Sequence, residues 1–134
     1  MLLYGIYRAI VAGSPHIPRG LQYSLARRMA DLYYAGSRRD REAVLANLRV
    51  IHGPAAPEAL LRREARGTFH SFGMYLAEFF GYRRFGPEFL DAHVGVHGRA
   101  HLDAALARGR GCLFISGHYS NWELGASMVG HLGY

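Results

Sequence analysis

The spacing of apolar residues changes at His93, and this change constrains the fold of the 134-residue chain more than its composition does. Before His93, apolar side chains recur every three or four residues, the period of amphipathic helices. After it come short continuous apolar runs such as "CLFIS" at residues 112–116. Such runs, bounded by turn residues, predict buried strands.

Glycines and prolines divide the chain into predicted elements. Helices are expected over residues 1–12, 21–36, 38–52 and 57–81, with Ser37 as an N-cap and Gly53 as a stop. A strand over 93–98, a helix over 99–108, a strand over 112–116 and a helix over 121–132 should follow. This order predicts an α/β fold, in which a helical N-terminal region leads into the first strand-helix units of a layered domain. Two strands cannot complete such a sheet, so the chain is expected to be the truncated beginning of a larger domain.

The charge of the chain favours an anionic partner. All 16 basic residues are arginine, and the formal net charge is +6. Guanidinium groups bind phosphates in a bidentate manner, which suits phospholipid headgroups as well as nucleic acid. The arginines are dispersed and no nucleic-acid-binding module is recognisable, so we expect no nucleic acid partner. A solvated surface explains any single arginine pair equally well.

Residues 1–20 form the first predicted segment, a membrane-associating helix. The apolar part is too short to span a bilayer, but its apolar residues follow helical spacing, as in a helix that lies in the membrane interface. The alternative is an ordinary first helix packed on its own domain. The single cysteine, Cys112, excludes an internal disulfide and fits a reducing compartment or a cytosolic membrane face.

One histidine and one glutamate stand between the second predicted strand and the last predicted helix. His118 follows the apolar run, and Glu123 falls in the first turn of that helix. Open α/β sheets place ligand-binding and catalytic groups at this end of a strand. Residues five apart in a helix point about 140° away from each other, so the pair can meet only if His118 lies on the turn. A histidine oriented by a carboxylate can act as the general base for a hydroxyl.

Neighbouring residues can supply the turn and bind substrate. Gly117 gives the backbone freedom, Ser120 or Asn121 can cap the helix, and the amides at the helix start can stabilise an oxyanion or a phosphate. The catalytic candidates are His118 and Glu123, and the substrate-binding candidates are Gly117, Ser120 and Asn121. Chance gives about 0.6 pairs of His-x4-Asp/Glu in a chain of this composition, so the spacing alone is not specific.

Two further patterns have ordinary structural explanations. His93, His97 and His101 recur every four residues, as metal ligands on a helix would, but Gly95 and Gly98 interrupt the run and no metal site is expected. The aromatic stretch at residues 68–82 is expected to be core, with a lipid channel as the alternative. Its apolar line continues that of the preceding turns: Leu61, Ala65, Phe69, Phe72, Leu76 and Phe79.

The block at residues 94–133 resembles the bacterial lauroyl/myristoyl acyltransferases of lipid A biosynthesis and the related phosphatidylinositol mannoside acyltransferases. It contains "LDAALARGRG", an apolar run, and then the order His-aromatic-x-Asn-Trp-Glu. Upstream, "REAVLANLRVIHG" and "ARGTFHSFGMYLAEF" are similar to the N-terminal helical region of these enzymes. The resemblance therefore covers nearly the whole chain.

The resemblance implies an O-acyltransferase with no cofactor. His118 would be the base of the HX4(D/E) motif and would take a proton from a hydroxyl of a lipid or glycolipid acceptor, which then attacks an acyl thioester. Glu123 would orient His118. The acyl donor would be acyl carrier protein or acyl-CoA, and the expected location is the cytoplasmic face of the bacterial inner membrane, as a peripheral protein or with a short N-terminal anchor.

The chain departs from the family pattern at two positions of the motif. Tyr119 stands where the family usually has phenylalanine, and Ser120 stands where glycine is common. Family members are about twice as long, so residues 21–134 are expected to be the N-terminal part of a single acyltransferase domain that has further substrate-binding residues downstream. Two alternatives remain: another lipid acyltransferase of the same superfamily, and a non-catalytic basic fragment that associates with membranes.

Overall fold

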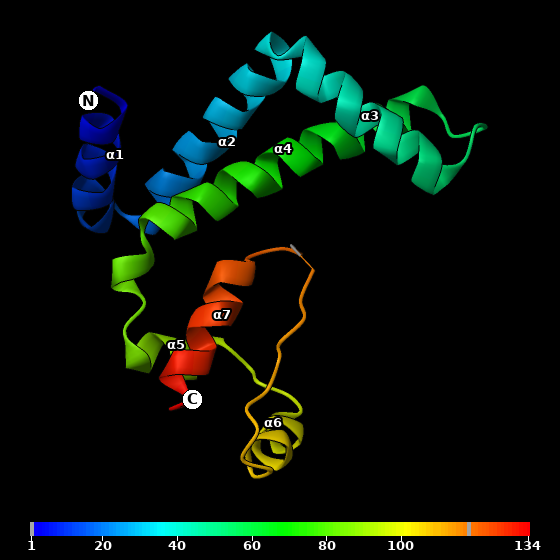
Figure 1. Ribbon diagram of the computed structural model, residues 1–134. Coiled ribbons are helices and arrows are strands. Elements are labelled where there is room, and N and C mark those ends of the chain that lie inside the picture. The colour runs from blue at the N-terminus through cyan, green and yellow to red at the C-terminus, as the bar shows by residue number, and fades with distance from the viewer. Residues whose placement is uncertain (1, 118) are drawn as a thin grey trace. The chain divides into compact units, whose positions relative to one another are not determined.

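All regular secondary structure of the described residues is helical (Figure 1). The computed structural model describes residues 2–117 and 119–134. These residues divide into two compact units, and the boundary between them in the sequence falls between residues 83 and 84. Each unit is described by itself.

The first unit contains four α-helices. They are α1 (Leu2–Gly13), α2 (Arg19–Gly36), α3 (Arg38–His52) and α4 (Glu58–Phe80), with a short 3-10 helix at Ser14–His16 between α1 and α2. These bounds confirm the four helices predicted from the apolar period to within two residues at each end.

The predicted helix breakers lie where the helices end. Gly53 has a φ of 83°, in the left-handed region that favours glycine, and its amide donates to the carbonyl of Arg49 at 2.9 Å. Ser37 precedes α3 as predicted, but its hydroxyl donates to the carboxylate of Asp40 at 2.7 Å and makes no side-chain cap to the backbone. Pro57 precedes α4 in an extended conformation.

The helices α2 and α4 lie side by side along most of their length (Figure 1). A methyl group added at Gly73 of α4 would lie 2.9 Å from the carbonyl oxygen of Ala26 and 3.2 Å from Cβ of Ala30 in α2. The absence of a side chain at Gly73 therefore permits this close approach.

A polar cluster also joins α2 to α4. The carboxylate of Asp31 accepts hydrogen bonds from Nε and Nη2 of Arg66 at 2.7 and 2.9 Å, and Nε2 of His70 lies 2.6 Å from its Oδ1. The hydrogen bonds from Arg66 and then from His70 hold the pKa of Asp31 well below its ordinary value of 3.8. Farther along, the hydroxyl of Tyr23 donates to Oε1 of Glu78 at 2.9 Å.

The core of this unit lies where α3 packs on α4. Leu45 of α3 and Leu61 and Ala65 of α4 are 1%, 2% and 0% exposed. Tyr34 and Leu48 pack against this cluster. The buried part of α4 therefore faces α3 near its start and α2 farther on.

The predicted apolar line of α4 is only partly core. Leu61, Ala65 and Phe69 are buried, whereas Phe72 is 56% exposed and Phe79 is 39% exposed. The second half of α4 thus leaves large aromatic side chains open to solvent, although the period of the sequence is the same in both halves.

The helix α1 packs against the end of α4. The ring of Tyr7 meets the ring of Phe80 edge-on with 5.7 Å between centroids, whereas Tyr4, Ile6 and Ile10 are exposed. Among the described helices, none is both long and apolar enough to cross a membrane.

The second unit contains three short helices, α5 (Pro87–His93), α6 (Arg99–Leu106) and α7 (Trp122–His131). Leu90 of α5 and Met128 of α7 are buried, and Nε2 of His131 lies 2.8 Å from Oδ1 of Asp91. The helix α5 was not predicted, although Pro87 stands within its first turn, where proline is favoured.

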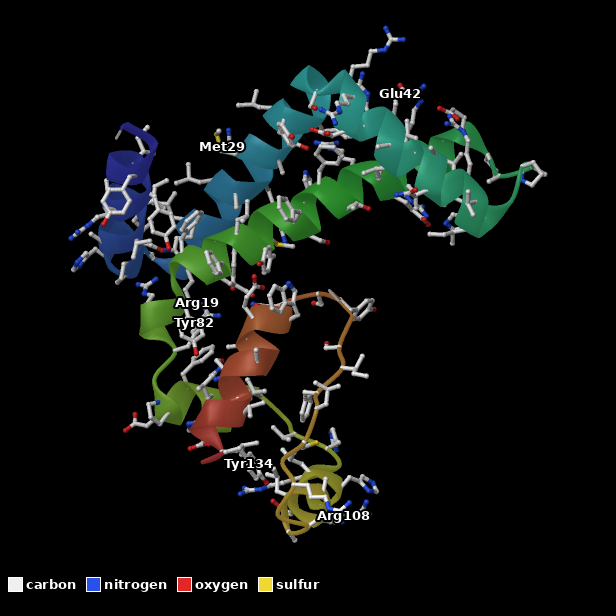
Figure 2. The ribbon with its side chains drawn as sticks, in the orientation of Figure 1. Arg19, Met29, Glu42, Tyr82, Arg108 and Tyr134 are labelled. Carbon is white, nitrogen blue, oxygen red and sulfur yellow. The ribbon has the colours of Figure 1, made fainter. Side chains whose placement is uncertain are left out.

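A hydrogen-bonded cluster links α6 to the end of the described chain. Nε of Arg99 donates to the hydroxyl of Tyr134 at 2.9 Å, and that hydroxyl donates to the carboxylate of Asp103. The bond to Asp103 raises the pKa of Tyr134. Tyr134 and Arg108, which follows α6, are labelled in Figure 2.

The prediction of an α/β fold is wrong for the described residues, because they contain no strand. Residues 94–98 and 111–117 have no regular secondary structure and do not pair with each other. Leu113 and Ile115 are 85% and 88% exposed, so the apolar run is not buried. An apolar run of this kind predicts burial between neighbouring strands, but a strand forms only where a second strand completes its hydrogen bonds.

Candidate functional site

The candidate catalytic residues follow the extended segment at 111–117. The side chains of Cys112, Leu113 and Phe114 are exposed, although the apolar run predicts a buried strand there. His118, the predicted general base, lies outside the described residues. The site is therefore built from the residues on either side of it.

The backbone between the extended segment and α7 turns at Ser120. The amide of Tyr119 donates to the carbonyl of Gly117 at 2.8 Å. Ser120 has a φ of 54°, which places it in the left-handed region, whereas Gly117 lies outside that region. The position that needs glycine-like freedom is thus Ser120 and not Gly117.

Asn121 is the N-cap of α7, and it is one of the two capping candidates, Ser120 and Asn121, that the sequence offered. Its Oδ1 accepts a hydrogen bond from the amide of Leu124 at 3.2 Å, and the carbonyl of Asn121 accepts from the amide of Gly125. The cap satisfies one of the four amides that lack a partner at the start of a helix. Asn121 thereby fixes where the helix begins.

Glu123 lies in the first turn of α7, which was also predicted. Its side chain is half-buried and its Oε2 is shielded from solvent. The start of a helix is favourable for a negative charge because the peptide dipoles point their positive end there. The neighbouring Trp122 is 38% exposed, so its ring is not part of a sealed core.

The arrangement offers a carboxylate and polar groups in one turn of chain. Ser120 lies at the bend, Asn121 caps α7 and Glu123 lies in its first turn, whereas Gly117 belongs to the segment before the bend. A carboxylate at this place can orient an imidazole, and first-turn amides can stabilise an oxyanion.

The described residues contain no group of three or more His, Cys, Asp or Glu side chains that could hold a metal ion. His93 of the suspected run stacks on Phe89, with 4.2 Å between ring centroids, and its Nδ1 lies 2.9 Å from the carbonyl oxygen of Phe89.

Two histidines pair with carboxylates that were not predicted as their partners. Nε2 of His52 lies 2.6 Å from Oε2 of Glu64, and His70 joins Asp31 as described above. The partners are 12 and 39 residues away in sequence, so no local spacing signals either pair.

An apolar groove is the second candidate site, and it lies within the first unit. It has a volume of about 950 Å³ and is bordered by α1, α2 and α4. Met29, labelled in Figure 2, is one of its lining residues. The large apolar and aromatic lining side chains of α2 and α4 are Leu25, Met29, Tyr33, Phe69, Phe72, Leu76 and Phe80.

The chain was compared with known proteins and families. No curated protein and no solved structure matches it. The sequence profile described as bacterial lipid A biosynthesis acyltransferase matches residues 2–133, which include the α7 turn and the groove. A match over nearly the full chain establishes the family: the chain belongs to the bacterial lipid A biosynthesis acyltransferases.

Proposed function

We propose that the protein transfers a fatty acyl chain from an acyl thioester to a hydroxyl of a lipid A precursor, with His118 as the general base. The observation that carries the proposal is Glu123, half-buried in the first turn of an Asn121-capped helix that begins four residues after His118 in a chain of this family. The donor is acyl carrier protein or acyl-CoA, and the acceptor is a lipid or glycolipid at the cytoplasmic face of the inner membrane.

The reaction needs one base and a stabilised oxyanion. The imidazole of His118 takes the proton of the acceptor hydroxyl, and the oxygen attacks the thioester carbonyl carbon. The tetrahedral intermediate collapses when the C–S bond breaks, and the proton returns from the imidazolium to the departing sulfur. The products are an ester and a free thiol, so atoms and charge balance.

Glu123 acts as the positioning residue in this proposal. A carboxylate that accepts a hydrogen bond from one imidazole nitrogen leaves the other nitrogen free to accept the substrate proton. The shielding of Oε2 from solvent supports this role, because such a hydrogen bond is stronger away from water. The charge of Glu123 also stabilises the imidazolium that forms when the proton is taken.

The bend at Ser120 supports the geometry. Ser120 is left-handed and α7 begins only at Trp122, so the 140° separation of residues five apart within one helix does not apply to this pair. Asn121 then holds the first turn of α7 in place through its cap.

The test is the transfer of a radiolabelled acyl chain from a thioester donor to lipid acceptor, measured in the intact enzyme. General-base catalysis contributes about 10²- to 10⁴-fold, so His118→Ala should lower the rate by at least that factor. Glu123→Gln keeps the shape but removes the charge and should lower it less. The matched control is His101→Ala, an exposed histidine of α6. Unchanged turnover in His118→Ala would refute the proposal.

A further inference from the structure

Ser120 has a backbone conformation that residues with a side chain rarely adopt. Among residues 2–117 and 119–134, it is the one residue other than glycine with a positive φ, at 54°. We propose that Ser120 is a positioning residue for acyl transfer, because its left-handed backbone sets the placement of His118 relative to Glu123. This role rests on the proposed function. It gives Ser120 a backbone role in place of the substrate contact expected from the sequence.

Elsewhere the described chain has glycine where its backbone is left-handed. In that region a Cβ atom lies too close to the following carbonyl oxygen, and glycine avoids this cost. The other described residues with a positive φ are Gly53, Gly98, Gly109, Gly111 and Gly133. A serine in this conformation is therefore strained. Strained backbone persists only where its surroundings hold it, and it is concentrated at functional sites.

Hydrogen bonds on both sides of Ser120 stabilise the turn. Before it, the amide of Tyr119 donates to the carbonyl of Gly117 at 2.8 Å. After it, Oδ1 of Asn121 accepts from the amide of Leu124 at 3.2 Å and fixes the start of α7. All of these residues lie in the second unit, so the turn is defined within that unit alone.

The φ of Ser120 sets the direction of the chain that carries His118. The ordinary regions for residues with a side chain begin at a φ of about −50°, so leaving 54° for them turns the preceding chain by about 100° or more. Consecutive Cα atoms are about 3.8 Å apart, and His118 stands two steps before Ser120, so such a turn moves it by several ångströms. A misplacement of only about 1 Å can cost a catalyst about 100-fold in rate. Molecules that leave the left-handed form should therefore be inactive.

Two substitutions separate the backbone of Ser120 from its hydroxyl. Ser120→Gly removes the hydroxyl and favours the left-handed form, whereas Ser120→Thr keeps the hydroxyl and disfavours that form through its branched Cβ. Both are made in the intact enzyme and assayed by transfer of a radiolabelled acyl chain. We expect a kcat for Ser120→Thr at least about tenfold below that of Ser120→Gly, because the left-handed form is about tenfold less populated with a side chain. The KM for the thioester should be similar in the two variants, because the turn acts on the reaction step.

Equal rates in these two variants would overturn the proposal. A faster Ser120→Thr would also overturn it, because the hydroxyl and not the backbone would then be the functional group. A second pair, Ser120→Asn and Ser120→Val, lacks the hydroxyl altogether. Asparagine tolerates the left-handed region and valine does not, so Ser120→Asn should be the faster of the two, and the reverse order would count against the backbone role. Circular dichroism checks that each variant keeps the helical content of the parent.

A matched control and a cycle with Glu123 distinguish positioning from a general effect on the fold. Ser116→Thr adds the same methyl group four residues earlier, where φ is not positive, and should change kcat by less than about twofold. In a Glu123→Gln background, the ratio of kcat between Ser120→Gly and Ser120→Thr should shrink to below about threefold, because the contact that Ser120 positions is already weakened. A ratio that stays at about tenfold would mean that Ser120 acts independently of Glu123, which contradicts the proposal.

Assay of His118→Ala beside these variants distinguishes failure of the positioning role from failure of the proposed function. If His118→Ala is inactive while Ser120→Gly and Ser120→Thr have equal rates, the positioning role is wrong and the general base stands. If His118→Ala keeps the turnover of the parent, the proposed function is wrong, and the positioning role of Ser120 is wrong with it.

Discussion

Replacing Gly73 by alanine places a methyl group at a point where α4 meets α2. The added carbon would lie 2.9 Å from the carbonyl oxygen of Ala26, which is backbone and cannot rotate away. Forcing extra volume into such a contact costs about 1 to 3 kcal/mol. Alanine also improves helix formation over glycine by about 1 kcal/mol, so the net change should lie between about 0 and 2 kcal/mol of destabilisation.

The matched control is Gly67→Ala in the same helix. A methyl group at Gly67 has no neighbouring atom within 4 Å, so only the helix term of about 1 kcal/mol remains and the variant should be more stable than the parent. The two variants should therefore differ by about 1 to 3 kcal/mol, with the exposed position the more stable.

Urea unfolding followed by far-ultraviolet circular dichroism measures this difference. The slope of the free energy of unfolding against urea should be the same for both variants, so that the midpoints report stability alone. Equal stabilisation by both alanines would refute the packing of α2 against α4 at Gly73.

Three further predictions concern the stability of the two units. The pKa of Asp31 is lower in the folded protein than in the unfolded chain, so its ionised carboxylate stabilises the fold at pH values above the ordinary pKa of 3.8. This stabilisation is lost as the pH falls from 3.8 through the pKa of the folded state. Asp31→Asn should therefore lower the urea midpoint at pH 7, and the difference in midpoint between variant and parent should become smaller at acid pH. A difference in midpoint that does not change with pH would contradict this. Leu45→Ala should cost about 2 to 5 kcal/mol in urea unfolding, whereas truncation of Val50, which is 85% exposed, should cost far less. Asn121→Ala should cost about 1 kcal/mol and speed amide hydrogen exchange in the first turn of α7, whereas unchanged exchange would argue against the cap.

The helices of the first unit could be predicted because their signals are local. Apolar residues at helical spacing mark each helix, and Gly53 and Pro57 stand at their ends. The same signal does not tell which half of a helix is covered. Phe69 is buried against the rings of Tyr33 and Tyr34, whereas Phe72 is exposed, although both lie on the same apolar line. Burial therefore depends on which side chains of the neighbouring helix lie opposite, which the period does not show.

The strands could not be predicted reliably from the apolar run at residues 112–116. The run shows a segment able to be buried in a sheet, but strand formation depends on partners elsewhere. In the described residues no such partner is present, and Leu113 and Ile115 are exposed. By contrast, α5 was missed because its seven residues are too few to show a clear apolar period.

The motif was the most predictable part of the candidate site. Glu123 lies in the first turn of α7 as predicted, and Asn121 is the one of the two capping candidates that caps the helix. The turn itself was assigned to the wrong residue, since Ser120 and not Gly117 takes the left-handed conformation. The ion pairs of His52 and His70 were not predictable, because tertiary contact alone joins them to Glu64 and Asp31.

The central claim of the proposed mechanism is that Glu123 contributes to catalysis only by orienting His118. A double-mutant cycle on the rate of acyl transfer tests this claim most directly. Rates are compared for the parent enzyme, Glu123→Gln, His118→Ala and the double variant. If Glu123 acts through His118, the double variant should be no slower than His118→Ala, because the residue that Glu123 orients is already gone. Losses that multiply in the double variant would show that the two residues act independently and would contradict the mechanism.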